Sequence, residues 1–437
     1  MAQQSLNIGV GMMKLLPQMY QPYKYRLYPF KAQERELLRQ LSELNYLWNH
    51  ALEERSSAWK GAKHRVSYVG QCHSLTRWRN YDKGGLGRVY AQVAQDTLHR
   101  LDEAFQRFFL RCKLKAQGKW KGPLGYPQFK RETFSLTYSQ ANNGSVKFTD
   151  GRNHTHRLYL SKIGHIPIEL DRRLPVGKVK TCTVKREGDR WFIILTYEVA
   201  NPAPPTGTPQ KPVGVDIGLT HLATLSTGEM VEPPKFLRHM ENLLKRRQRD
   251  VSRKVKGSRN REKAKVRLAR CHAKVRDQRR DFAHKLTTGW ADTYDLIGVE
   301  DMDVRNMMGN HHLAKSIGDS GWGMLRQMAE YKMRNHSKWF FPVDAKNTTQ
   351  SCSKCGQLAD PKLTLKDRVL QCPCGHTEDR DVNAAKNIVK SALAMVPGGT
   401  GETTPVETGP PPARKGRRVR SKKQEPPCAI EVALEGA

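Results

Sequence analysis

Apolar residues recur along the chain with two different periods, and the change of period divides it into segments. Residues 23–30, YKYRLYPF, alternate like a β-strand, whereas residues 31–118 carry apolar side chains at the three- and four-residue spacing of helices. Gly and Pro interrupt residues 118–127, and six short alternating runs follow up to residue 200. This pattern predicts a small helical unit followed by a small β-barrel or sandwich.

The second half of the chain begins at a proline-rich segment, 201–212. Its prolines forbid both helix and central strand, so it predicts a linker. The elements expected after it are short strands over 212–232, a long basic helical segment over 236–288, a buried strand at 294–301, and helices near 322–339 and 381–396. Residues 397–437 contain few apolar side chains and are expected to be disordered.

Composition adds a strong bias in charge. The 437 residues include 76 Lys and Arg against 42 Asp and Glu, a formal net charge of +34. Such a surplus favours a polyanionic partner, and the length and apolar content suffice for roughly two to four folded cores. No run of about 18 apolar residues could span a bilayer, and the N-terminus makes a poor signal peptide. We therefore expect an intracellular protein without a membrane partner.

Four of the nine cysteines cluster within 23 residues, as Cys352-x-x-Cys355 and Cys372-x-Cys374. Four thiolates on two tight turns suit tetrahedral Zn²⁺, and a glycine follows each pair, as such turns require. The second pair is one residue closer than the usual CxxC spacing, so a set in which His376 replaces Cys374 stays open. Four free cysteines, the alternative reading, would leave this spacing to chance. We predict one structural zinc ion.

Three acidic residues occur where a carboxylate is a poor structural choice. Asp216 lies inside the apolar strand VGVDIGL, Glu300 ends the apolar strand LIGVE, and Asp381 begins a helix. An unpaired buried carboxylate costs on the order of several kcal/mol. Singly, Asp381 could be a helix N-cap, Glu300 an ion-pair partner and Asp216 a satisfied turn acid. Together, they predict an RNase H-like sheet that gathers catalytic carboxylates around two Mg²⁺ ions for phosphodiester hydrolysis.

A basic helical segment and some aromatic residues are candidates for nucleic-acid contact. Between Lys245 and Lys285 there are 18 Lys or Arg and four acids, with an apolar stripe along one face. The remaining circumference predicts a cationic ridge, against the alternative of a solvated charged face. Trp48, by contrast, occupies an apolar helical position and is expected in the core. The candidate contacts are Arg246, Arg247, Arg253, Arg261, Arg267, Trp59, Trp78 and Tyr81.

Several blocks together resemble the TnpB family of transposon-encoded RNA-guided DNA endonucleases, relatives of type V CRISPR effectors. They are GVDIGLTHLATLSTGE, DQRRDFAHKLT, LIGVEDMDVRNMM, NTTQSCSKCG and DRDVNAAKNI, joined upstream by YKYRLYPFKAQE, LWNHALEE, GYPQFK and REGDRWFIILTYEV. The resemblance spans residues 23–396. It implies a guide-RNA-dependent endonuclease whose single RuvC site cuts both strands of DNA beside a short motif that the protein reads.

The resemblance also implies a multidomain α+β architecture, with a helical recognition lobe inserted in a small wedge β-barrel. A RuvC α/β nuclease domain with an inserted zinc ribbon would follow. The expected divisions are a leader at 1–22, the wedge barrel at 23–30 and 126–200, the recognition domain at 31–125, a linker at 201–212, the nuclease domain at 213–350 and 377–396, the zinc ribbon at 351–376, and a disordered basic tail at 397–437. By the same likeness, Asp216 would bridge both Mg²⁺ ions while Glu300 and Asp381 complete their shells.

Guide RNA derived from the transposon end and double-stranded target DNA are the implied partners. The favoured assembly is a monomer bound to RNA, located in the prokaryotic cytoplasm and associated with the nucleoid. The alternative function is a nuclease-inactive, RNA-guided DNA-binding repressor, and the presence of all three carboxylates argues against it. A strand-joining transposase with a nucleophilic Tyr and a metal-binding His pair is a weaker rival, because an HxH pair occurs only at His154 and His156, in a polar turn.

Overall fold

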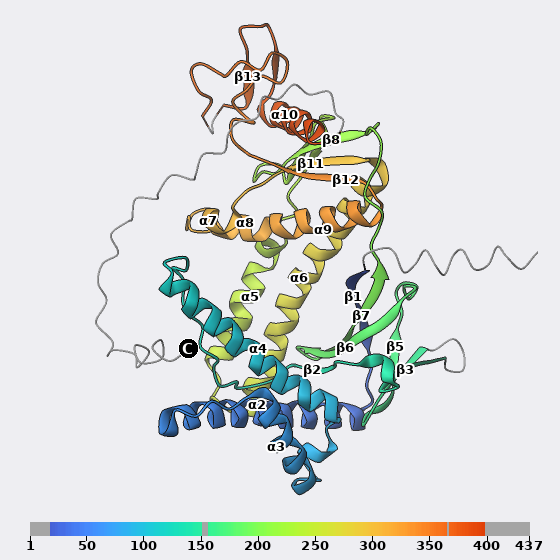
Figure 1. Cartoon of the computed structure of the whole chain (residues 1–437). Coiled ribbons are helices and arrows are strands. Elements are labelled where there is room, and N and C mark those ends of the chain that lie inside the picture. Colours follow the sequence, from blue (N-terminus) through green and yellow to red (C-terminus); the bar gives the residue numbers. More distant parts are fainter. Residues whose placement is uncertain (1–17, 151–155, 365–366, 398–437) are drawn as a thin grey trace, which may run out of the picture.

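The computed structural model describes residues 18–150, 156–364 and 367–397. The chain in these ranges forms two large sheets, which are joined by a helical hairpin, and one small two-stranded sheet (Figure 1). The predicted tail and most of the predicted leader lie outside the described residues. One sheet packs against the helices that follow residue 30, and the other is formed by the second half of the chain. Within these ranges, none of the helices is long and apolar enough to cross a membrane.

Three long helices confirm the helical unit predicted after residue 30. They are α2 (Lys31–Ala62), α3 (Tyr68–Tyr81) and α4 (Ala91–Ala116), with a short 3₁₀ turn, η1 (Leu86–Arg88), before α4. The apolar stripes of α2 and α4 are buried in one core with the inner face of the first sheet. Trp48 lies in this core, as predicted, and its indole N–H donates to the Gln128 carbonyl at 3.1 Å.

Seven antiparallel strands form the first sheet, in the order β2-β6-β7-β1-β5-β4-β3. They are β1 (Gln18–Leu27), β2 (Ser135–Tyr138), β3 (Val146–Asp150), β4 (His156–Leu160), β5 (Gly164–Glu169), β6 (Lys178–Glu187) and β7 (Arg190–Ala200), with the 3₁₀ turn η2 (Ala141–Asn143) between β2 and β3. All six strands predicted after residue 127 are therefore confirmed. β1 begins at Gln18, so the predicted leader is wrong in its last five positions, which pair with β7 instead.

A closed barrel, which the sequence predicted, is not what these strands form. The strand order is linear, and among the described residues no backbone ladder joins the edge strands β2 and β3. Closure depends on strand length, tilt and register, which alternation alone does not encode. β2 is only four residues long and pairs with β6 alone, so its outer edge is too short to complete a ring. The sheet is open.

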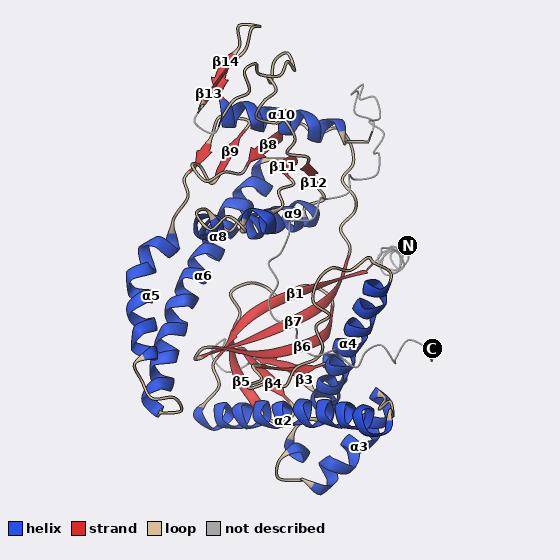
Figure 2. Ribbon diagram, turned by 90° about the vertical axis from the view of Figure 1, so that its left-hand side faces the viewer, coloured by secondary structure: helices blue, strands red, loops and turns tan. Residues whose placement is uncertain are grey.

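The long basic segment folds as two helices rather than one. α5 (Phe236–Ser252) and α6 (Arg259–Thr293) are separated by a turn in which Gly257 has φ +84° and the Ser258 side chain accepts the Arg261 N–H at 3.2 Å. A Gly followed by a Ser N-cap is a sequence signal for such a break, and it was missed. Figure 2 shows the hairpin running from the second sheet alongside the first.

Ion pairs attach α6 to the hairpin between β6 and β7. Arg276 contacts Glu187 at 2.9 Å, and Arg190 contacts Asp277 at 2.7 Å. Lys24 of β1 reaches the same Glu187 at 2.8 Å. The two sheets are therefore connected through charged side chains on the middle of α6.

The second sheet has the order β10-β9-β8-β11-β12, and its three last strands run parallel. Its strands are β8 (Pro212–Asp216), β9 (Ala223–Leu225), β10 (Met230–Val231), β11 (Leu296–Glu300) and β12 (Trp339–Val343). The remaining elements are α7 (Val304–Met307), α8 (Ala314–Ser320), α9 (Trp322–Asn335), the hairpin of β13 (Val369–Gln371) and β14 (Thr377–Asp379), and α10 (Arg380–Ala394). α6 and α9 cover one face of the sheet and α10 the other (Figure 1).

Two glycines allow α10 to lie directly on the sheet. A Cβ at Gly214 of β8 would come within 1.9 Å of the Ala385 carbonyl oxygen, and one at Gly298 of β11 within 2.7 Å of the Ala392 Cβ. The helix therefore approaches the two strands more closely than a larger residue at position 214 or 298 would permit. This approach brings the N-terminal end of α10 to the carboxyl ends of β8 and β11.

Gly214→Ala should lower the free energy of unfolding by about 1–3 kcal/mol, because the added methyl group must push the backbone of α10 away from β8. Thermal or denaturant unfolding measures this. Gly289→Ala is the matched control, since a Cβ at this position would meet nothing within 4 Å. Because it replaces a glycine in a helix, this substitution should leave the free energy of unfolding unchanged or raise it by about 0.5–1 kcal/mol. Equal stability of the two variants would contradict the close contact.

Candidate functional site

Asp216 and Glu300 lie side by side at the carboxyl ends of two parallel strands. Val215 of β8 is in register with Val299 of β11, so the two acids occupy the next positions on strands about 4.8 Å apart. Only 8% of Asp216 and 7% of Glu300 is exposed. The strands are apolar and buried up to these residues, which places both carboxylates in a poorly solvated setting.

Asp381 comes to the same place from the other end of the chain, in the first turn of α10. It is not the N-cap of this helix, the role that its position alone had left open. Asp379 is the N-cap, and its Oδ1 accepts the N–H groups of Asp381 at 2.9 Å and Val382 at 3.1 Å. The Asp381 carboxylate is thus left to face the ends of the strands.

Electrostatics shows that the three carboxylates influence one another. Burial raises the pKa of Asp216 well above its usual range, and the negative charges of Glu300 and Asp381 raise it further. Burial also raises the pKa of Glu300, to which Asp344 and Asp381 contribute. The structure therefore brings together the three acids that the sequence singled out, in a setting that disfavours three negative charges without a compensating cation.

Four further residues at these carboxylates were missed by sequence reasoning. The Thr348 hydroxyl donates to Glu300 Oε1 at 2.6 Å, and Asp344 follows β12 beside it. Arg380 contacts Asp381 at 3.1 Å, and Arg368 contacts it at 3.7 Å while donating to the Thr220 hydroxyl at 3.0 Å. Only Arg380 is a sequence neighbour of an identified acid, so only this residue carried a local signal.

The four cysteines form the one group of at least three potential metal-binding side chains, within the described ranges, whose ligand atoms all lie within 4.8 Å of one another. The three carboxylates are spread more widely than this. One small ion could not reach all three at once in this arrangement. A wider spacing is compatible with two ions, since such pairs lie about 3.5–4 Å apart.

Sulfur positions in the cysteine cluster match a tetrahedral site. The Sγ atoms of Cys352 and Cys374 are 3.8 Å apart, and those of Cys355 and Cys372 are 3.5 Å apart. Four ligands at about 2.3 Å from a tetrahedral centre would be separated by about 3.8 Å. His376 lies outside the group and contacts Glu378 at 3.2 Å, so the geometry favours Cys374 as the fourth ligand.

The backbone of the two turns supports the cluster. The N–H of Gly356 donates to the Cys352 carbonyl at 2.9 Å, and Gly375 does the same for Cys372. Both glycines have φ near +80°, where other residues are strained. Burial raises the pKa of the Cys352 thiol, but the N–H groups of Cys355 and Lys354 outweigh this and lower the pKa to about 6. The thiolate required for metal binding is thereby favoured.

The predicted nucleic-acid contacts lie on α2 and α3 and on the α5–α6 hairpin. Trp59 and Tyr81 are 44% and 95% exposed, whereas Trp78 packs edge-on against His50, with ring centroids 4.6 Å apart, and contacts the core. The five predicted arginines lie at the end of the hairpin that is distant from the second sheet: Arg246 and Arg247 on α5, Arg253 after it, and Arg261 and Arg267 on α6.

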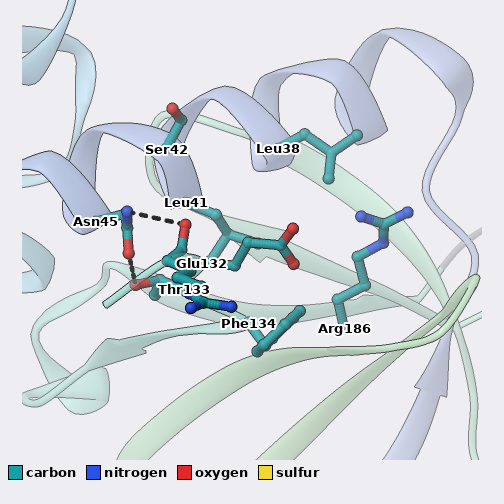
Figure 3. A pocket seen from close by; sticks show the side chains of 9 residues that line it. Leu38, Leu41, Ser42, Asn45, Glu132, Thr133, Phe134 and Arg186 are labelled. Atoms are coloured by element: carbon teal, nitrogen blue, oxygen red, sulfur yellow. Dashed lines mark hydrogen bonds between the residues drawn. The ribbon is translucent and has the colours of Figure 1, made fainter. Parts of the chain in front are cut away.

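A pocket of about 180 Å³ lies in the other part of the molecule, between α2 and the segment before β2 (Figure 3). Leu38 and Ser42 line one side, and Thr133 closes another by donating to Asn45 Oδ1 at 3.1 Å. Its volume is below the roughly 300–1,000 Å³ of small-molecule sites. It does not adjoin the carboxylates. The histidine pair of the rival transposase is not placed, since His154 lies outside the described residues.

Three family models match the chain. One described as a probable transposase matches residues 194–311, one described as the TNB domain of Cas12f1-like proteins matches 322–388, and one described as a helix-turn-helix domain matches 19–64. The last range contains strand β1 and the single long helix α2, so a helix-turn-helix is not what it forms here.

Individual proteins match over most of the chain. A protein of Streptomyces pristinaespiralis named "Putative RNA-guided DNA endonuclease" is 37% identical over 418 residues, which cover 94% of this chain and 98% of that protein. InsQ of Escherichia coli (strain K12), named in the same way, is 28% identical over 86% of this chain and 93% of its own length. The cryo-EM structure of a Cas12f1-sgRNA-target DNA complex has a similar fold, with a TM-score of 0.54, 13% identity, and coverage of 85% of this chain and 99% of that one.

These matches show the class of fold, that of Cas12f-type effectors, and this chain has mixed α/β sheets and a four-cysteine cluster. Within that class, the chain belongs to the TnpB family, as the sequence blocks had indicated.

Asp216→Asn should stabilise the protein in the absence of divalent ions at pH 7. The unfolded chain ionises this carboxyl near its usual pKa of about 3.9, whereas the folded protein resists ionisation. Folding therefore loses stability as the pH rises above about 4, and the amide removes that loss. The melting temperature of the variant should exceed that of the wild type by several degrees at pH 7 and converge with it towards pH 4. A pH-independent difference would contradict the raised pKa.

Proposed function

We propose that this protein is an RNA-guided endonuclease that hydrolyses phosphodiester bonds of DNA paired to its guide. The observation that carries the proposal is the convergence of Asp216, Glu300 and Asp381 from three distant parts of the chain. The names of the relatives in Streptomyces and Escherichia coli support both the guide RNA and the DNA substrate. Pairing to a guide would supply sequence specificity, which suits a chain whose surplus charge favours phosphates over base edges.

The three carboxylates fit Mg²⁺ as catalytic cofactor. Their oxygens are the hard ligands that this ion prefers, and their burial leaves negative charge that a dication would compensate. Two ions bound here would activate water and stabilise the leaving oxygen of the phosphodiester. Asp216, Glu300 and Asp381 would together hold these ions. Arg380 and Arg368 balance part of the charge of Asp381.

The same proposal assigns roles to the rest of the chain. The second sheet with its helices would be the RuvC nuclease domain, residues 213–350 and 377–396, and residues 351–376 its zinc ribbon. The first sheet would be the wedge domain, and the helices α2 to α4 the recognition domain within residues 31–125. The exposed arginines at the tip of the α5–α6 hairpin would hold phosphates, each adding roughly one unit to the salt dependence of binding.

The nuclease-inactive repressor is the alternative. A repressor of this kind would tolerate loss of the acids, whereas this chain retains all three, and burial of Asp216 and Glu300 is costly. We therefore favour an active enzyme.

Asp216→Ala should abolish cleavage of a guide-matched DNA while the RNA complex still forms, because the charge that holds the metal ions is lost but no apolar packing is. Cleavage is measured on labelled duplex and RNA binding by filter retention. Asp281→Ala, an exposed acid paired with Lys285 at 2.8 Å on α6, is the control and should cleave normally. Guided cleavage by Asp216→Ala at the wild-type rate would refute the assignment.

We propose zinc as the ion of the cysteine cluster. Cys374→Ser should lose bound zinc and lower the melting temperature, because metal binding contributes directly to the folding of such small modules. His376→Ala should keep one zinc ion per chain. Elemental analysis by mass spectrometry measures both, and zinc loss in His376→Ala with retention in Cys374→Ser would assign the fourth ligand to the histidine.

A further inference from the structure

Thr348 precedes the first cysteine turn by four residues, and its hydroxyl donates to Glu300 of the candidate nuclease site. We propose that Thr348 is a positioning residue that orients Glu300 for metal binding, and that Asn387 of α10 holds its main chain in place. The inference rests on the proposed function, and it adds residues that the three acids alone do not include.

The contact to Glu300 is buried and short. Thr348 is 6% exposed, and its Oγ1 lies 2.6 Å from Glu300 Oε1 and 3.2 Å from the Ala345 carbonyl oxygen. One hydroxyl proton can serve only one of these acceptors. An ionised carboxylate is the stronger acceptor, so the proton goes to Glu300. With Oε1 bound in this way, the carboxylate plane is oriented and Oε2 is left for a ligand.

Asn387 fixes the backbone on which Thr348 sits. Its Nδ2 group donates to the Thr348 carbonyl at 2.8 Å and to the Ser351 carbonyl at 2.7 Å, which uses both of its protons. The side chain of Thr348 is thus held by Glu300 and its main chain by α10.

Asn383 continues the same network to the first cysteine turn. It has no exposed surface, and its amide donates to the Ser351 carbonyl at 2.7 Å while its Oδ1 accepts the Ser353 N–H at 2.7 Å. Ser353 directly follows Cys352. Asn383 and Asn387 are four residues apart, so they project from one face of α10.

This face belongs to the helix that also carries Asp381. Glu300 on β11 and Asp381 on α10 approach each other across a contact between a strand and a helix, and their relative position must be set by something more than the backbone. The hydrogen bonds from Asn387 to Thr348 and from Thr348 to Glu300 form a direct polar link between these two elements. Residues that orient metal ligands in this way typically contribute 10–100-fold to metal affinity or activity.

The test compares Thr348→Val, which keeps the shape and removes the hydroxyl, with Thr348→Ser, which keeps the hydroxyl. Full-length protein bound to guide RNA is titrated with Mg²⁺, and cleavage of matched DNA is followed. Thr348→Val should raise the Mg²⁺ concentration for half-maximal cleavage on the order of tenfold, and Thr348→Ser should stay near the wild type. Thr349→Val is the matched control at the next position and should also match the wild type.

A second readout does not depend on cleavage. The rise in melting temperature on adding Mg²⁺ to the full-length protein should shrink in Thr348→Val and persist in Thr348→Ser. Asn387→Ala keeps the hydroxyl but releases the backbone, so it should shift both readouts in the same direction as Thr348→Val. If Thr348→Val does not fold, Asn387→Ala decides the question.

A wild-type Mg²⁺ midpoint and a wild-type melting shift in Thr348→Val would overturn the inference, even if the variant were less stable, because Thr348 would then be structural only. The proposed function fails in a different way, by the absence of guided cleavage in the wild type. In that case the Mg²⁺-dependent melting shift of wild type and variant still decides whether Thr348 orients Glu300.

Discussion

The contact between α10 and the glycines of two parallel strands is the constraint on which the candidate site depends. Gly214 and Gly298 place no side chain of their own between helix and sheet, so α10 packs closely there and its first turn reaches the ends of β8 and β11. A helix held a few ångströms further away would carry Asp381 out of range of Asp216. The carboxylates come together because the backbone packing allows it, and the apolar cores on both faces of the sheet offset the cost of burying them.

The cysteine cluster has a structural relation to the carboxylates that follows from chain order. The segment 344–379 begins directly after β12 and ends at the N-cap of α10, so both of its ends lie beside the acids. Arg380 donates to the Thr364 carbonyl of this segment, and Arg368 of the same segment pairs with Asp381. A metal that orders the two cysteine turns would thereby order residues that contact the nuclease site, without being part of the reaction.

Some of the basic side chains of α5 and α6 form ion pairs within the molecule, and others are exposed. On α6, Arg270 and Arg276 pair with Asp189 and Glu187 of the first sheet, which ties the two sheets together. Arg279 pairs with the buried Asp319, whose carboxylate also accepts the N–H of Leu237 in the first turn of α5. Towards the tip of the hairpin, Arg246, Arg253 and Arg267 are exposed. A uniform cationic ridge was therefore too simple an interpretation of the segment, because part of its surface is an interface within the molecule.

Sequence alone determined the elements and the chemistry that depend on local patterns. The period of apolar positions depends only on which face of an element is buried, so helices such as α4 and strands such as β7 were predictable. The cysteine cluster was predictable as well, because the spacing within each pair is set by a single turn of the chain. The tertiary structure decided whether the first sheet closes and which residues contact Glu300. It also decided which charged side chains of α6 pair with the first sheet. Thr348 and Arg368 reach the acids only after the chain has folded, because such contacts join positions whose separation along the chain carries no periodic signal.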